Sequence, residues 1–259
     1  MNILYPVNKC TKIKINPSLY ENINTDIGVS VITCTNKKNK YQSILNNYNR
    51  QVYQKKELII ILNDNSLEID KYKIDKQSNV KIFQLNQKIT LGECLNFAVD
   101  KSKYPIISKF DDDDYYAPKY LSDSIKALGY TNADIVGKSS TFVYFEKDNT
   151  LAIKNNNRDN RYVYRVEGST LIFRKEILDD IRFKPKNLGE DLEFCKDAIK
   201  KGYKIYSSNI HHYLYIRNSN NNHSWKIPNE YLIKYCKIIC KEKSINYILN
   251  NYIDVTSHK

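Results

Sequence analysis

The sequence predicts an α/β fold in which a mostly parallel sheet is covered by helices on both faces. Four apolar runs rich in β-branched residues have the length of buried strands. The runs are continuously apolar rather than alternating, which is typical of parallel strands buried on both sides. Segments with helical spacing of apolar residues lie between some of these runs, as expected of strands joined by crossover helices.

The elements of the first half follow one another as strand, helix, strand, strand, helix, strand. The predicted strands cover residues 28–35, 57–62, 80–85 and 105–110. A helix is predicted over 40–51, where Ile44, Leu45 and Tyr48 recur at helical spacing, and another begins at Leu91. The second half predicts shorter strands at 134–138, 140–146 and 150–154, a strand that continues into a helix at Lys175, and a helix over 189–202 with Leu192, Cys195 and Ile199 on its buried side.

The chain ends are predicted to be appendages of one large domain. Residues 1–26 are weakly patterned and interrupted by two prolines, so they are assigned as an extension, and the domain covers 27–225. The remainder, 226–259, includes a run from Tyr231 to Leu249 that alternates lysine with apolar residues and predicts a basic amphipathic helix. Such a helix suits contact with anionic lipid, and packing on the core or on a second subunit is the alternative.

Composition limits the class of protein. A chain of 259 residues with 41% apolar residues supports one sizeable core. The net charge of +12 favours an anionic partner, which leaves nucleic acid, a phosphate-bearing substrate and an acidic membrane surface open. The six dispersed cysteines are typical of reduced thiols, and neither a leader nor a membrane-spanning run is apparent. These features predict a soluble cytoplasmic protein that could still rest on a membrane surface.

Polar segments follow three of the predicted strands. They are "TCTN", "NDNS" and the run "DDDD", Asp111 to Asp114. Because ligands of parallel α/β sheets bind beyond the carboxyl ends of the strands, we expect these segments to share one rim. In an extended chain alternate side chains point the same way, so Asp111 and Asp113 are predicted to converge on one cation such as Mg²⁺ or Mn²⁺. A solvated acidic turn is the alternative.

Two further segments carry candidate residues. In "GED", a carboxylate at a helix start either favours the helix dipole or serves as a general base. The strand phase of "IHHYLYIR" assigns His212 to the core. The polar segment from Arg217 to Trp225 contains His223 and is interpreted either as a flap that brings a cation and an imidazole to a phosphate or as a linker.

Taken in order, "TCTN", "NDNS", "GECLNFA", "FDDDDYYAP", "GSTLIFRKEIL" and "GEDLEF" resemble a family 2 glycosyltransferase with the GT-A fold, over about residues 28–225. The aspartate motif is similar to that of a subgroup associated with bacterial surface or spore polysaccharides. This resemblance implies the GT-A fold with a smaller acceptor-side subregion. It also implies an inverting, metal-dependent transfer of a sugar from a nucleoside diphosphate donor, a UDP-sugar in the simplest case, to a hydroxyl of a glycan or lipid-linked acceptor.

The resemblance also assigns roles to residues of this sequence. Asp191 matches the general base. Metal binding, to Mn²⁺ or Mg²⁺, is assigned to Asp113, Asp111 and His223. Donor contacts are assigned to Thr33, Thr35, Asp64, Asn96, Asp111, Asp112 and Arg217. The sequence departs from the family pattern at Leu95, where arginine is common, and at Asn63, where an acidic residue is common.

Two alternatives to an active transferase remain open at this stage. One is a basic nucleotide- or nucleic-acid-binding protein, although no helix-turn-helix, zinc or RNA-binding signature is recognisable and we therefore predict no nucleic-acid partner. The other is a catalytically silent domain of the same fold.

Overall fold

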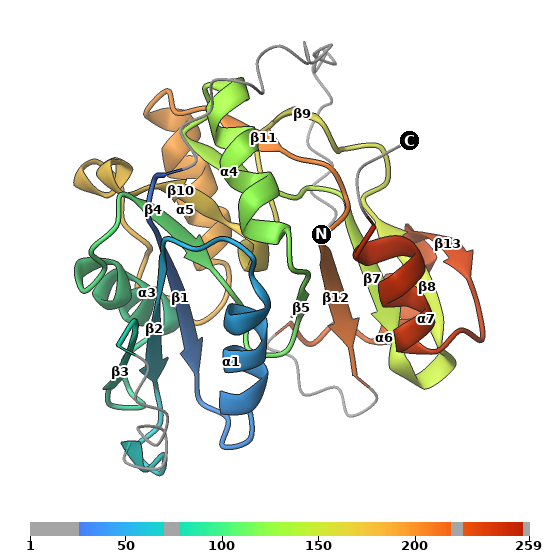
Figure 1. Cartoon of the computed structure of the whole chain (residues 1–259), viewed down its shortest axis with the longest axis horizontal. Coiled ribbons are helices and arrows are strands. Elements are labelled where there is room, and N and C mark those ends of the chain that lie inside the picture. The colour runs from blue at the N-terminus through green and yellow to red at the C-terminus, as the bar shows by residue number, and fades with distance from the viewer. Residues whose placement is uncertain (1–25, 70–77, 219–224, 256–259) are drawn as a thin grey trace.

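The computed structural model describes residues 26–69, 78–218 and 225–255. The described chain forms two sheets that lie side by side, as Figure 1 shows, the larger with helices packed on it and the smaller formed by later strands. The larger sheet has the strand order β3-β2-β1-β4-β10-β6-β11-β9, and the smaller has the order β13-β8-β7-β12-β5. Among the described residues, no helix is long and apolar enough to cross a bilayer.

The four predicted strands of the first half are present and parallel. They are β1 (Val29–Thr35), β2 (Lys56–Leu62), β3 (Val80–Gln84) and β4 (Ile106–Lys109). The parallel pairs are β1 with β2, β1 with β4 and β2 with β3. The side chains of β1, β2 and β4 are almost all buried, which explains why their sequences do not alternate. The prediction of a parallel sheet at this end of the chain is therefore confirmed.

Helices cover both faces of this sheet. On one face, α1 (Tyr41–Arg50) and α4 (Tyr120–Thr131) share a core with Val29 and Val31 of β1. On the other, α3 (Leu91–Asp100) and α5 (Glu190–Lys200) share a second core with Ile32. Thr90 and Glu93 form a reciprocal capping box that fixes the start of α3. α4 is an additional helix that lies outside the predicted elements.

The buried side of α5 differs in part from the prediction. Cys195 is buried as expected, but its buried neighbours on the helix are Phe194 and Ala198, whereas Leu192 and Ile199 are only half-buried. Phe194 stacks on Phe183, with ring centroids 4.3 Å apart, and this contact rotates the large aromatic side chain inward. Apolar spacing alone could not choose between two adjacent phases of the helix.

The second half completes the large sheet with two strands, β10 and β9, that run in the opposite direction to the others. β10 (Ile172–Arg174) lies between β4 and β6 (Ile135–Gly137) and is antiparallel to both. β11 (Ile205–Ser207) runs parallel to β6, and β9 (Arg161–Val163) is antiparallel to β11 at the edge. A 3₁₀ helix, η4 (Lys175–Asp179), follows β10 where the sequence predicts that a helix begins.

The smaller sheet is built from short strands. They are β5 (Tyr115–Tyr116), β7 (Thr141–Phe145), β8 (Thr150–Lys154), β12 (Tyr213–Arg217) and β13 (Cys236–Cys240). Because β5 pairs with β12 while β4 belongs to the larger sheet, residues 110–114 cross from one sheet to the other. The run of aspartates therefore lies at the junction of the two sheets.

The predicted helix from Tyr231 to Leu249 is wrong. That segment forms the end of α6 (Asn229–Leu232), the 3₁₀ helix η5 (Ile233–Tyr235), the strand β13, the short helix α7 (Ile245–Ile248) and the start of a π-helical turn, η6 (Leu249–Ile253). β13 pairs antiparallel with β8, whose other edge is taken by β7. β-Branched residues such as Ile238 and Ile239 favour a strand over a helix. Pairing with the available edge of β8 therefore overrides the helical spacing of this segment. Lipid contact by this segment stays a prediction.

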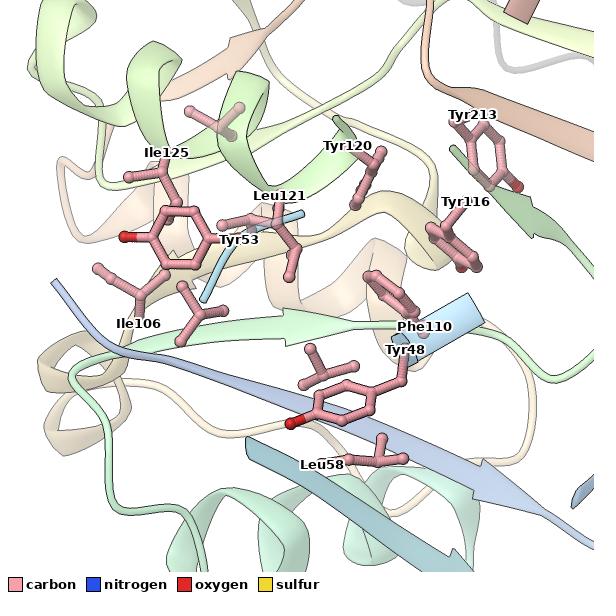
Figure 2. Packing of buried hydrophobic residues seen from close by; sticks show 14 of the residues in the cluster. Tyr48, Tyr53, Leu58, Ile106, Phe110, Tyr116, Tyr120, Leu121, Ile125 and Tyr213 are labelled. Carbon is pink, nitrogen blue, oxygen red and sulfur yellow. The ribbon is translucent and has the colours of Figure 1, made fainter. Parts of the chain in front are cut away.

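A layer of aromatic rings packs at the junction of the two sheets. Phe110 and Tyr116 stack with centroids 3.8 Å apart and an interplanar angle of 3°, and Tyr120 meets both at their edges. Figure 2 shows these rings close to Tyr213 of β12, whose centroid is 5.3 Å from that of Tyr116. These rings belong to the residues before, within and after β5, so they fix the path of the chain on both sides of the aspartates.

Candidate active site

Three polar segments meet at the carboxyl rim of the parallel strands, as the sequence predicts. The β1–β2 register pairs Thr35 with Leu62, so that "NDNS" begins beside the end of β1. The backbone N–H of Asn63 donates to the Thr35 carbonyl at 2.8 Å, and that of Phe110 donates to the Ile32 carbonyl at 3.0 Å. The aspartate run follows Phe110 directly. The rim therefore holds the predicted candidate segments together.

The aspartate run is a bend, so its side chains do not alternate as in a strand. Asp112 and Asp113 share one partner, because Lys37 Nζ lies 2.9 Å from an oxygen of each. Asp111 instead pairs with the ammonium of Lys109. Because the run bends, Asp111 and Asp113 contact different lysines here, and their convergence on one metal ion stays a prediction.

Asp112 is tied to the first strand as well as to Lys37. Thr35 Oγ1 donates to Asp112 Oδ2 at 2.5 Å, and the Lys37 backbone N–H donates to Thr35 Oγ1 at 3.1 Å. Burial and the neighbouring Asp113 raise the pKa of Asp112, and Lys37 opposes this rise. Burial lowers the pKa of Lys37, but Asp113 and Asp112 outweigh it and hold that pKa above its usual range, so the ammonium stays charged.

Asp114 has a structural environment. Its side chain is buried, Tyr213 Oη donates to Oδ2 at 2.5 Å, and the Ile216 backbone N–H donates to Oδ1 at 3.2 Å. Burial, together with the charges of Asp113 and Asp111, raises the pKa of Asp114 well above its usual range. These contacts join the aspartate run to β12, and they account for a carboxylate to which the sequence assigned no role.

Lys109 links the aspartate run to the first turn of α5. Burial lowers its pKa, but the carboxylates of Asp111, Glu190 and Asp191 outweigh burial and hold the pKa above its usual range. The sequence places Lys109 some eighty residues from Glu190 and Asp191, and the fold brings their charges into mutual range. Burial raises the pKa of Glu190, and Lys109 opposes that rise. The ammonium of Lys109 thus stabilises a second acidic group at the same rim.

Asp191 occupies the first turn of α5, where the helix begins after Gly189. Gly189 adopts φ 80°, a left-handed conformation that favours glycine and turns the chain into the helix. Asp191 Oδ2 lies 3.6 Å from a guanidinium nitrogen of Arg165. Gly168 lies against the same side chain, because a β-carbon at Gly168 would be 2.7 Å from Asp191 Oδ2. The Asp191 side chain is therefore only partly exposed, at 16%.

Thr33 and Asp64, both predicted to contact the donor, differ in accessibility. Thr33 is fully buried in β1, and its hydroxyl has no hydrogen-bond partner in the described part of the chain. Asp64 is partly exposed on the rim and accepts a hydrogen bond from the Ser66 backbone N–H at 2.7 Å. Hydrogen bonds from Ser66 lower the pKa of Asp64. Asp64 is therefore ionised and accessible, whereas Thr33 lies beneath the rim.

The side chains of Asn96 and Arg217 are occupied by contacts within the chain. The Asn96 amide donates to the Phe183 carbonyl at 2.9 Å and accepts from the Phe183 N–H at 3.1 Å. Arg217 is buried in β12, and its guanidinium donates to four acceptors. They are Asn229 Oδ1, Tyr215 Oη and the carbonyls of Trp225 and Ile227. In this structure both side chains position neighbouring segments, and their donor roles stay predictions.

Of the two histidines considered in the sequence, the structure describes only His212. His212 is buried, as predicted, and burial lowers its pKa to about 4. It lies in a turn just before β12 rather than in the strand, with φ 68°. His223, predicted as a metal ligand, lies outside the described residues.

Lys37, Lys109 and Gly168 are the residues that sequence reasoning missed at this site. Lys37 follows "TCTN" and Lys109 directly precedes Phe110, so both lysines sit at the ends of strands that were predicted to reach the rim. Four adjacent carboxylates require nearby positive charge, and lysines at the same rim were the available source. Gly168 carried no such local signal, because its role depends on the packing of Asp191.

The carboxylates of Asp112 and Asp113 fit a divalent cation that has few protein ligands. In the described part of the chain, no cluster of three or more His, Cys, Asp or Glu side chains could hold a metal ion. However, the Lys37 ammonium lies 2.9 Å from both Asp112 and Asp113, and this position is one that a cation favours. Carboxylate oxygens are hard ligands that suit Mg²⁺ or Mn²⁺, and a site with two of them leaves positions for phosphate oxygens.

Solved structures show which fold this chain shares. The S. aureus TarS 1–349 fragment in complex with UDP-GlcNAc matches with a TM-score of 0.59 and 19% identity, over 78% of this chain and 62% of that one. GalNAc-T7 with UDP, GalNAc and Mn²⁺ matches with a TM-score of 0.61 and 12% identity, over 76% of this chain and 45% of that one. The mannosyltransferase PcManGT from Pyrobaculum calidifontis, in complex with GDP-Man and Mn²⁺, matches with a TM-score of 0.55 and 15% identity, over 77% and 59%. The predicted GT-A fold is therefore confirmed.

Sequence comparison gives the family. The profile described as Glycosyl transferase family 2 matches residues 30–182, which is more than half of the chain, and the chain belongs to that family. The O-antigen biosynthesis glycosyltransferase WbnJ of Escherichia coli is 29% identical over 164 residues, which cover 58% of this chain and 63% of that protein. The chain thus spans less than two thirds of this relative's length.

Proposed function

We propose that this protein is a metal-dependent inverting glycosyltransferase. It transfers a sugar from a nucleoside diphosphate donor, a UDP-sugar in the simplest case, to a hydroxyl of a glycan or lipid-linked acceptor. The observation that carries the proposal is the position of Asp191 in the first turn of α5, where its charge and that of Asp111, the ion-pair partner of Lys109, both act on the Lys109 ammonium. Membership of glycosyl transferase family 2 supports the reaction class, and the UDP-sugar and Mn²⁺ named for similar folds support the donor and the metal.

In the proposed reaction the Asp191 carboxylate accepts the proton of the acceptor hydroxyl. The acceptor oxygen forms a bond to the anomeric carbon from the face opposite the diphosphate, and the bond from that carbon to the diphosphate oxygen breaks. The nucleoside diphosphate leaves with the electron pair, and Asp191 returns its proton to solvent. A general base in this role contributes about 10²–10⁴-fold to the rate.

The donor side of the proposal uses the rim residues. Asp64 and Thr35 are assigned to the nucleoside, with Thr33 beneath them. Asp111 and Asp113 are assigned to the metal, with Asp112 beside them, since the aspartate run follows the parallel strand β4 at the junction of the sheets. When bound, a divalent cation there acts as a Lewis acid that stabilises the charge developing on the diphosphate.

The acceptor side of the proposal uses the segments that flank Asp191. Tyr164 and Leu188 are large apolar side chains that are more than half exposed, at 56% and 62%. Tyr164 precedes Arg165, the partner of Asp191, and Leu188 lies three residues before Asp191. Exposed apolar side chains beside a base suit the C–H faces of a sugar ring, and the Arg165 guanidinium offers donors to hydroxyl or phosphate oxygens. We therefore infer that the acceptor binds between these segments.

The test replaces Asp191 by asparagine, which keeps the shape of the side chain but cannot accept a proton. We expect transfer to fall by about 10²–10⁴-fold, while the rise in melting temperature given by UDP or GDP with Mn²⁺ is retained. Glu193→Gln, two residues later on α5, is the matched control and should leave transfer unchanged. Turnover of Asp191→Asn near that of the wild type would overturn the assignment of the base. A melting temperature that responds to DNA but to neither nucleotide would overturn the transferase proposal itself.

A further inference from the structure

The Lys37 ammonium contacts two carboxylates of the aspartate run, one of which, Asp113, is assigned above to the metal. Its Nζ lies 2.9 Å from Asp112 Oδ1 and 2.9 Å from Asp113 Oδ2, so a single ammonium bridges two carboxylates. The two aspartates are largely buried, with side chains 7% and 14% exposed, and Lys37 is 31% exposed. Such a short double contact in a partly dehydrated site is much stronger than an ion pair on the surface.

The loop that carries Lys37 is itself held in place. The Lys37 backbone N–H donates to Thr35 Oγ1, and the same hydroxyl donates to Asp112 Oδ2 at 2.5 Å. Thr35, Lys37 and Asp112 thus form a closed set of contacts at the end of β1. The neighbouring Lys38 is exposed. The backbone and the ammonium of Lys37 are therefore both held by contacts to neighbouring residues.

An ammonium and a divalent cation cannot share these oxygens. Both require direct contact with the same carboxylates, and like charges a few ångströms apart repel strongly where water is partly excluded. Replacing Lys37 by a metal ion at these oxygens leaves the ammonium without its carboxylate partners. A diphosphate that arrives with the metal ion offers the ammonium a new anionic partner within reach of a flexible lysine.

We propose that Lys37 is the resident cation of the Asp112–Asp113 pair, and that it is displaced when a divalent cation and a nucleoside diphosphate bind together. The proposal rests on the function proposed above for the nature of the ligand. Metal ions alone then bind weakly, because they must expel Lys37 without compensation. The metal ion and the nucleotide each increase the affinity for the other, because the nucleotide supplies the partner that Lys37 loses.

The test measures Mn²⁺ binding without nucleotide, by electron paramagnetic resonance of the free ion. Lys37→Met removes the ammonium and keeps much of the side-chain length, so we expect Mn²⁺ to bind at least tenfold more tightly than to the wild type. Lys37→Arg, which keeps a cation, and Lys38→Met, which changes the exposed neighbour, should bind Mn²⁺ as weakly as the wild type does. Unfolding curves of each variant show whether the comparison is made between folded proteins.

The second measurement is the coupling between the metal ion and UDP. In the wild type, saturating UDP should tighten Mn²⁺ binding at least tenfold, and in Lys37→Met this factor should be several-fold smaller, because only direct contact between the diphosphate and the metal ion then couples the two. Wild-type protein that binds Mn²⁺ equally well with and without UDP, or Lys37→Met that binds free Mn²⁺ no better than the wild type, would overturn the proposal. If Lys37→Met binds Mn²⁺ more tightly but the wild type has no transferase activity, Lys37 is the resident cation and the proposed reaction is wrong.

Discussion

A single methyl group at Gly168 tests how closely the proposed base is held. A β-carbon there would lie 2.7 Å from Asp191 Oδ2, 2.8 Å from its Cβ and 2.9 Å from its Cγ. Since favourable contacts between carbon atoms begin at about 3.5 Å, the Asp191 side chain has to retreat by roughly 0.5–1 Å. The backbone of Gly168 is not in the left-handed region, so Gly168→Ala acts by contact rather than by backbone strain.

The magnitude follows from this displacement. Misplacing a reacting group by about 1 Å costs on the order of 10²-fold in rate. That loss corresponds to about 2.7 kcal/mol of barrier. The extra methyl group should also cost about 1–3 kcal/mol of folding stability, because it overpacks a closed contact. Binding of UDP with Mn²⁺ should be unaffected, because the displaced side chain is assigned to the acceptor oxygen.

The assay is kcat for sugar transfer at saturating donor, measured for Gly168→Ala, Asp191→Asn and the double variant. If the methyl group acts through Asp191, it should lower kcat about 10²-fold in the wild type and change the residual rate of Asp191→Asn by less than about twofold. A Gly168→Ala protein with the kcat of the wild type would refute the reasoning. Equal losses in the two backgrounds would mean that the methyl group disturbs something other than the base.

Two further predictions concern stability and its dependence on pH. Glu57 is buried on β2, where it accepts hydrogen bonds from Ser30 Oγ and the Lys103 N–H at 2.6 Å each. It also forms an ion pair with Lys81 at 2.9 Å. Burial raises the pKa of Glu57, but these partners outweigh burial and hold the pKa below its usual value. Glu57→Gln should therefore cost about 1–3 kcal/mol in urea unfolding at pH 7, a loss that shrinks below about pH 4 as the wild-type carboxyl takes up a proton. His212 has a pKa of about 4 when folded, below the usual value of about 6.5, so the wild type should lose stability as pH falls through that interval. His212→Asn, whose side chain tolerates the left-handed φ, should lose less stability between pH 7 and pH 5, and an equal loss in both proteins would contradict this account.

The sequence by itself determined the parallel half of the fold. Continuous apolar runs such as that of β2 are encoded by neighbouring residues, and a strand buried on both faces needs no further information to be recognised. The rule that ligands bind at the carboxyl ends of such strands then located the rim, and the "GED" segment placed Asp191 at a helix start. Local patterns were sufficient for these elements, whereas α4, whose buried residues also recur at helical spacing, was not predicted.

Local patterns failed where a partner comes from far along the chain. The helix predicted from Tyr231 became the strand β13, because β8 offers a sheet edge about eighty residues earlier in the sequence. The local conformation of the aspartate run shows the same limit, because the sequence predicts an extended run and the structure has a bend, flanked by the stacked rings of Phe110 and Tyr116.

Only the tertiary structure decided which cations the aspartates meet. Lys37 reaches Asp112 and Asp113 across 75 and 76 residues of sequence, and the Gly168–Asp191 contact also joins separate elements. The sequence determined that these carboxylates would stand at one rim, because strand polarity and burial are local properties. Their partners depend on how loops from different strands pack, since the energy of an ion pair follows distance and burial in space rather than order along the chain.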